Sequence, residues 1–229
     1  MQMWQHLGEF AVTFVALFPV VNPVGCAPIF LALTQSYPQS VRNVLAGKVA
    51  FYGFIMLAVS FLFGTPILDF FGISLAIIRI AGGLVVASTG WNLLNQSDSG
   101  GKDSSGVDSE TGTLTHAMDY AFYPLTLPIT VGPGCIAIAI TLGAHLKHEA
   151  GPIWERGYIS ALLGIFAICL LVWICYSRAD RLVKMLGKSG TEILTRLSAF
   201  ILLAIGVQIM WNGLKIGMPE LFSFLVGSH

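Results

Sequence analysis

Two long stretches without Asp, Glu, Lys or Arg, residues 10–41 and 120–146, each contain three prolines at the same spacing. The prolines at positions 19, 23 and 28 recur 105 residues later, at positions 124, 128 and 133. A proline inside a helix removes a backbone hydrogen bond and clashes with the carbonyl group four residues earlier, at a cost of about 3 kcal/mol. In hydrocarbon, such a break is tolerated only where protein or a water-filled cavity surrounds the freed polar groups. The pattern therefore predicts two broken membrane-spanning helices.

The composition agrees with a membrane protein. Hydrophobic residues make up 55% of the chain and charged residues 10%, whereas a soluble domain has about 25% charged residues. Lys+Arg and Asp+Glu number 12 each, so the charge balance indicates neither a nucleic acid partner nor a polybasic membrane-surface segment. The four cysteines lie in apolar segments, which favours buried free thiols over disulfides. Residues 1–9 lack a basic segment, so we expect a retained first span and not a cleaved signal.

Six stretches approach the length of about 20 apolar residues that a membrane-spanning helix needs. They lie at residues 10–33, 49–68, 72–95, 119–145, 157–177 and 194–214. Residues 96–118 are rich in Ser, Gly and acidic residues and predict a flexible cytoplasmic loop. We therefore expect an all-α integral membrane protein with six transmembrane spans, the first and fourth discontinuous. Residues 1–95 would form a first three-span repeat and residues 119–229 a second one.

A second correspondence supports this duplication. At an offset of 117 residues, Arg79 in the third span matches Arg196 in the sixth, and each helix later carries a Trp-Asn pair. A unit of three spans places its two copies in opposite membrane orientations, which is an inverted repeat. The alternative is a chance similarity between apolar helices. Seven Lys or Arg residues in the loops of one side against three on the other predict both termini on the periplasmic side.

The breaks are the candidate binding site. Asn is a favoured helix N-cap and Pro a favoured first helical residue, so a second half-helix is expected to start at Asn22-Pro23. Free N–H groups and a partial positive charge at such a start can bind a carboxylate. Unwound carbonyls and Thr hydroxyls can bind an ammonium group or a cation. The predicted substrate-binding residues are Asn22, Pro23, Gly25, Thr126, Thr130, Gly132 and Gly134. The alternative is that the prolines only kink two helices for packing.

Arg79 and Arg196 are the charged residues well inside the spans. An intramembrane arginine is by default a functional candidate. Each lies within about two turns of the start of its helix, so it can also snorkel to the interface or cap free carbonyls of a broken helix. Gating and structural roles both stay open. The small residues Gly82, Gly83 and Gly90 of the third span indicate close helix packing.

Several motifs in order resemble the MarC family of six-span bacterial and archaeal inner-membrane proteins. They are Asn22-Pro23-Val24-Gly25, Arg79-Ile80-Ala81-Gly82-Gly83, Pro124-x3-Pro128 with Gly132-Pro133-Gly134, and Gly187-Lys188-x-Gly190 before Arg196. The likeness covers nearly the whole chain. It implies discontinuous first and fourth spans in the inner membrane and a relation to SnatA-type transporters of small neutral amino acids.

The leading functional hypothesis is a transporter or exporter of small zwitterionic solutes, such as glycine or alanine, acting by alternating access. A passive channel or a membrane scaffold is the alternative. An intramembrane enzyme is the least favoured class, because the chain has no H-E-x-x-H, G-x-S-x-G or Walker A sequence. We expect no metal and no cofactor. The expected partners are a small-molecule substrate and the lipid bilayer, with a homo-oligomer as a further option.

Overall fold

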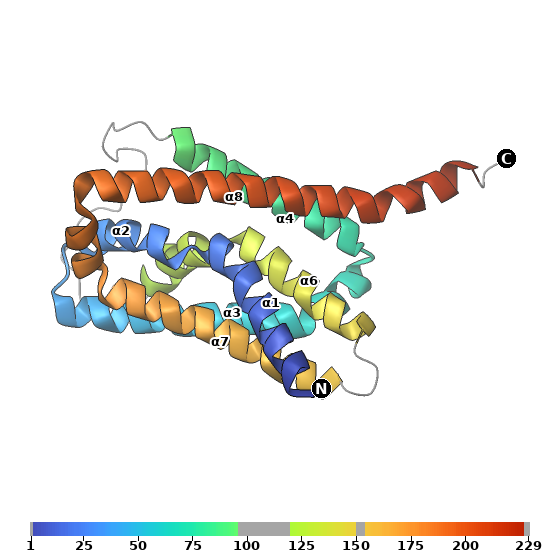
Figure 1. Ribbon diagram of the computed structural model, residues 1–229, viewed down its shortest axis with the longest axis horizontal. Helices are drawn as coiled ribbons and strands as arrows, with labels where there is room; N and C mark the ends of the chain where they lie inside the picture. Colours follow the sequence, from blue (N-terminus) through green and yellow to red (C-terminus); the bar gives the residue numbers. More distant parts are fainter. Residues whose placement is uncertain (1, 96–119, 150–153, 227–229) are drawn as a thin grey trace.

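The computed structural model of this chain describes residues 2–95, 120–149 and 154–226, and these residues form helices joined by short connections (Figure 1). No strand occurs among them. The elements are α1 (Gln2–Val21), α2 (Pro23–Thr34), α3 (Gln39–Phe71), α4 (Leu75–Asn95), η1 (Ala121–Thr130), α6 (Pro133–Glu149), α7 (Trp154–Ser177) and α8 (Ala179–Val226). The loop predicted at residues 96–118 lies outside the described residues.

The number and type of the spans agree with the sequence prediction. Four segments are long and apolar enough to cross a membrane alone: Gln39–Phe71, Leu75–Asn95, Gly157–Ser177 and Ser189–Met218. Two further spans are bent pairs. Leu7–Val21 and Pro23–Thr34 meet at 40°, and Ala121–Thr130 and Pro133–Lys147 meet at 68°. Counting each bent pair as one span gives six, so the predicted all-α membrane fold with discontinuous first and fourth spans is confirmed.

The buried side chains form one apolar cluster, to which α1, α2, α3, η1, α6 and α7 all contribute. The two bent pairs run antiparallel through it, because α1 contacts α6 while α2 contacts η1. The long helices α3 and α7 also contact each other. The bundle therefore places the two helix breaks side by side in its interior.

Helices α4 and α8 form a close antiparallel pair along one side of the bundle (Figure 1). A Cβ atom on Gly90 would lie 2.5 Å from the backbone nitrogen of Leu203, and one on Gly83 would lie 2.6 Å from the carbonyl oxygen of Gly206. The two backbones therefore approach too closely for larger residues, which confirms the predicted packing role of these glycines. α8 has one irregular residue, Gly187 (φ 65°, ψ −179°), before its apolar segment begins.

The two halves follow the same order of elements: a broken span, a long helix, and a helix that joins the α4–α8 pair. The two halves cannot, however, be aligned at one constant offset across the break. The second half-helix starts at Pro23 in one half and at Pro133 in the other, 110 residues later, and not at the residue 105 positions after Pro23. The additional residues lie in η1, where Tyr123 and Leu127 have extended dihedral angles. The superposition of the halves after a half-turn stays a prediction.

Candidate functional site

The break in the first span is organised by Asn22. It has a left-handed conformation (φ 45°, ψ 59°) and is the one non-glycine residue with positive φ in the described part of the chain. Asparagine tolerates this conformation better than most residues. The Gly25 N–H donates to Asn22 Oδ1 at 3.1 Å, and the Cys26 N–H donates to the Asn22 carbonyl at 2.9 Å. Asn22 is thus the N-cap of α2 and Pro23 its first residue, as the sequence predicts.

Gly25 fits beneath the carboxamide of Asn22. A Cβ atom at this position would contact Asn22 Nδ2 and would lie 2.7 Å from Asn22 Oδ1. The three nearest atoms to that Cβ all belong to the Asn22 side chain. Glycine is therefore required at this position by the cap that closes over it.

The break in the fourth span is stabilised by two threonines. Thr126 Oγ1 donates to the Ala121 carbonyl and Thr130 Oγ1 to the Leu125 carbonyl, both at 2.7 Å. Both threonines are buried, with 0% and 2% exposure. These bonds run to carbonyls five residues back, within the wide turns of η1, where prolines provide no N–H donor. The hydroxyl hydrogens therefore satisfy the irregular backbone of their own helix. The binding of an ammonium group or a cation by the hydroxyl oxygens stays a prediction.

The turn between η1 and α6 contains the predicted glycines. The Gly132 carbonyl accepts hydrogen bonds from the N–H groups of Cys135 at 3.0 Å and Ile136 at 3.3 Å, which starts α6. A Cβ atom on Gly132 would lie 3.2 Å from the Pro128 carbonyl oxygen. One on Gly134 would contact the Val86 side chain of α4. Gly132 therefore lies in the turn, whereas Gly134 lies at a helix–helix contact.

The two breaks meet around Tyr176 of α7. The Cys26 thiol donates to the Ile129 carbonyl at 3.7 Å, which joins α2 to η1. The hydroxyl oxygens of Thr130 and Tyr176 are 2.9 Å apart. Because the single hydroxyl hydrogen of Thr130 goes to a carbonyl, the Tyr176 O–H donates and Thr130 Oγ1 accepts. The ring of Tyr176 also stacks on Phe30 of α2, with centroids 4.5 Å apart.

Tyr176 is a site residue that sequence reasoning missed. It is one of the largest fully buried side chains, and it contacts both broken spans. A phenol near the end of an otherwise apolar span is the available sequence signal, because a buried Tyr O–H usually has a hydrogen-bond partner. That signal does not say which helix supplies the partner.

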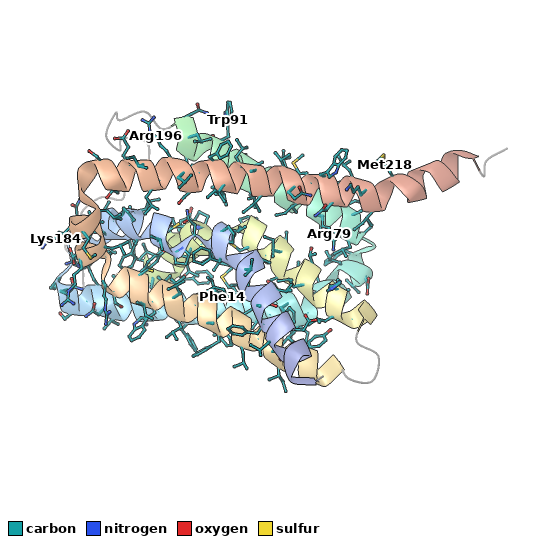
Figure 2. All side chains as sticks on the ribbon, viewed as in Figure 1. Phe14, Arg79, Trp91, Lys184, Arg196 and Met218 are labelled. Carbon is teal, nitrogen blue, oxygen red and sulfur yellow. The ribbon has the colours of Figure 1, made fainter. Side chains whose placement is uncertain are left out.

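The two arginines differ, and neither is at the breaks. Arg196 forms an ion pair with Glu192 one turn away, at 2.9 Å, and its side chain is 56% exposed. Arg79 Nε is shielded from solvent and has no hydrogen-bond partner among the described residues. Figure 2 shows the two arginines near opposite ends of the α4–α8 pair. Neither the ion pair of Arg196 nor the unpartnered Nε of Arg79 is a bond to a carbonyl of a broken span. The choice between gating and structural roles stays open.

Comparisons with known proteins agree with this architecture. The family described as "MarC family integral membrane protein" matches residues 7–218. The "UPF0056 membrane protein YvbG" of Bacillus subtilis is 33% identical over 210 residues, which are 92% of this chain and 96% of that protein. The "UPF0056 membrane protein MJ1677" of Methanocaldococcus jannaschii is 33% identical over 213 residues, covering 91% of this chain and 97% of the relative.

A third relative, the "UPF0056 inner membrane protein MarC" of Salmonella typhimurium, is 31% identical over 202 residues, 87% of this chain and 90% of that protein. No solved structure matches the chain significantly. The relatives' names and the apolar helices support a multi-pass protein of the inner membrane. The chain belongs to the MarC family of integral membrane proteins.

Proposed function

We propose that this protein transports small zwitterionic solutes, such as the neutral amino acids glycine and alanine, by alternating access at the site between its two broken spans. The observation that carries the proposal is the meeting of the breaks, where the Cys26 thiol of α2 contacts the Ile129 carbonyl of η1. Paired discontinuous helices in the two halves of a membrane protein are the pattern in which transporters bind substrates and ions. No catalytic step is part of this proposal.

The carboxylate would bind at the start of α2. Asn22 Oδ1 now accepts the Gly25 N–H, and Pro23 provides no N–H. A substrate carboxylate would replace the Asn22 oxygen as the acceptor, so the donor would stay paired in both states. Such an exchange of acceptors costs little free energy, whereas a buried N–H without an acceptor costs about 1–3 kcal/mol. The partial positive charge of the helix start favours the carboxylate over the neutral amide oxygen.

The ammonium group would bind to carbonyls of η1. Ile129 has a carbonyl that faces α2 and accepts the weak thiol donor of Cys26. An ammonium group is a stronger donor, and its bond to a carbonyl is charge-assisted. Opening the site would break this contact and the Thr130–Tyr176 hydrogen bond, which join α2 to η1 and η1 to α7 in the described structure. The substrate would thus replace hydrogen bonds that protein groups make to one another in its absence.

Uptake into liposomes tests the proposal. The purified full chain should take up alanine or glycine with saturation, and a proton or sodium gradient should reveal whether transport is coupled. Uptake without saturation would support a passive channel instead. Complete absence of uptake under all gradients and orientations would support the scaffold alternative. Labelling of a cysteine added at each end of the chain with an impermeant reagent, in intact cells, tests the proposed periplasmic location of both termini.

A further inference from the structure

The exposed face of α8 carries two carboxamide side chains. α8 lies along one edge of the bundle (Figure 1), and its apolar segment, Ser189–Met218, has the smallest buried share of the four single-helix spans. Gln208 and Asn212 are both exposed, and Gln208 Nε2 donates to Asn212 Oδ1 at 3.0 Å. Each carboxamide has two N–H donors and one carbonyl acceptor. This bond therefore leaves Gln208 Oε1 and Asn212 Nδ2 without a partner among the described residues.

The contact with α4 gives the depth of these groups in the membrane. α4 has 21 residues, and at about 1.5 Å per residue it just crosses a hydrocarbon core of about 30 Å. A Cβ atom on Gly206 of α8 would contact the backbone of Gly83 and Ala87, which lie on either side of the α4 midpoint. Gly206 is thus near the bilayer centre. Gln208 follows it by roughly 3 Å along the helix axis and Asn212 by roughly 9 Å, so both carboxamides lie within the hydrocarbon.

The outer face of α8 also has the spacing of a helix-packing interface. Exposed residues recur along it at alternating intervals of four and three positions, which is the 3.5-residue period of a coiled-coil contact. The row of α8 that packs on α4, from Ala199 to Gly213, has the same period. The small residue Ala204, at the middle of the outer row, allows a second helix to approach closely. This outer row, the α8 seam, consists of Leu197, Ile201, Ala204, Gln208, Trp211 and Lys215.

We infer that the α8 seam is the interface of a homodimer in the membrane, with Gln208 at its centre. Lipid tails cannot bond the free groups of Gln208 and Asn212, whereas carboxamides of a second helix can. The partner is a second copy of this chain, because a carboxamide is both donor and acceptor and therefore pairs with itself. In a dimer whose two-fold axis lies along the membrane normal, the same seam residues of both chains meet.

The position of Gln208 suits this role. A single polar residue at one position of an apolar seam fixes the register of the two helices. The seam residues next to Gln208, Ala204 and Trp211, are uncharged, so nothing repels a second copy near the crossing point. The inference does not depend on whether the protein transports amino acids.

Disulfide formation between full-length chains in native membranes tests the contact. Ala204→Cys lies in the seam, one turn from Gln208, and should give a covalent dimer on mild oxidation. Val207→Cys is the matched control, because this residue is 54% exposed but lies outside the seam, and it should stay monomeric. The wild type should form no covalent dimer, since three of its cysteines are buried and Cys26 lies at the crossing of the broken spans. A covalent dimer through Val207→Cys but not through Ala204→Cys would overturn the inference.

Energy transfer between fluorescently labelled chains in liposomes measures the strength of the dimer. Gln208→Leu keeps a good helix former in an apolar span, so the chain should still fold. It should raise the dissociation constant of the dimer at least tenfold, as expected for the loss of hydrogen bonds between helices. Thr89→Val of α4 is the control, because its exposed hydroxyl already donates to the Val85 carbonyl outside the seam, and it should leave the dissociation constant unchanged.

Two results of the energy-transfer experiment would overturn the inference. The first is a wild type that stays monomeric at every protein-to-lipid ratio, which would leave the α8 seam to lipid or to a different protein. The second is a dissociation constant that Gln208→Leu does not change. If Gln208→Leu does not fold, the two cysteine variants decide.

Discussion

The contact between Gly25 and Asn22 predicts an unusual effect of a single methyl group. In Gly25→Ala, the new Cβ would contact Asn22 Nδ2 and lie 2.7 Å from Oδ1. The Asn22 carboxamide must then move away. This breaks the N-cap hydrogen bond and leaves the Gly25 N–H without its acceptor, at about 1–3 kcal/mol. Alanine regains about 1 kcal/mol of helix propensity, so we expect a net destabilisation of about 1 kcal/mol.

A double-mutant cycle isolates the cause. In an Asn22→Gly background the clashing side chain is absent and the left-handed backbone is still accessible, because glycine adopts positive φ without strain. There, Gly25→Ala should become neutral or stabilising by up to about 1 kcal/mol. The coupling between the two positions should therefore be about 1–2 kcal/mol, above the deviation from additivity expected of independent sites.

Thermal unfolding of the purified protein in detergent measures the effect. A destabilisation of about 1 kcal/mol corresponds to a midpoint lower by roughly 2–4 °C for a chain of this length. Gly47→Ala is the matched control, because this glycine also lies inside a helix and a Cβ there would have no neighbour closer than 3.8 Å. It should not lower the midpoint. An equal loss for Gly25→Ala with and without Asn22 would refute the capping argument.

Three further predictions follow from the same contacts. If a carboxylate binds at the start of α2, alanine should compete for transport at least tenfold better than alaninamide or ethylamine. Only alanine brings a negative charge, which the partial positive charge of the helix start and a charge-assisted hydrogen bond favour. Equal competition by all three would exclude this recognition. Tyr176→Phe should cost about 1 kcal/mol in unfolding experiments. Thr130→Val should cost roughly 2–4 kcal/mol, because it leaves the buried Tyr176 O–H without its acceptor and removes the side-chain hydrogen bond to the Leu125 carbonyl. A smaller loss for the valine variant would contradict the proposed bond directions. Arg42→Gln should lower the thermal midpoint clearly more than Lys147→Gln. Arg42 bonds Asp180 through two nitrogens (2.9 and 3.2 Å) and its side chain is 15% exposed, whereas the ion pair of Lys147 with Asp69 is exposed and 3.5 Å long. Equal losses would show that burial does not determine the strength of these ion pairs.

The sequence by itself determined the features that depend on local chemistry. Apolar length and missing charge gave the spans, and proline positions gave the two broken ones. The start of α2 at Asn22-Pro23 was also predictable, because an N-cap and the residue after it are set by side chains within one helical turn. The family followed from the same motifs, since they occur in a fixed order along the chain.

The tertiary structure decided what each polar group bonds to. The hydroxyl of Thr130 can serve a ligand or its own backbone, and the wide turns of η1 direct it to the backbone. Gly134 resembles a turn glycine in the sequence, but its neighbour is Val86 of α4, 48 residues earlier in the chain. Tyr176 joins the site because α7 crosses both broken spans. Such roles depend on helices brought together by packing between distant segments, and local spacing carries no information about those contacts.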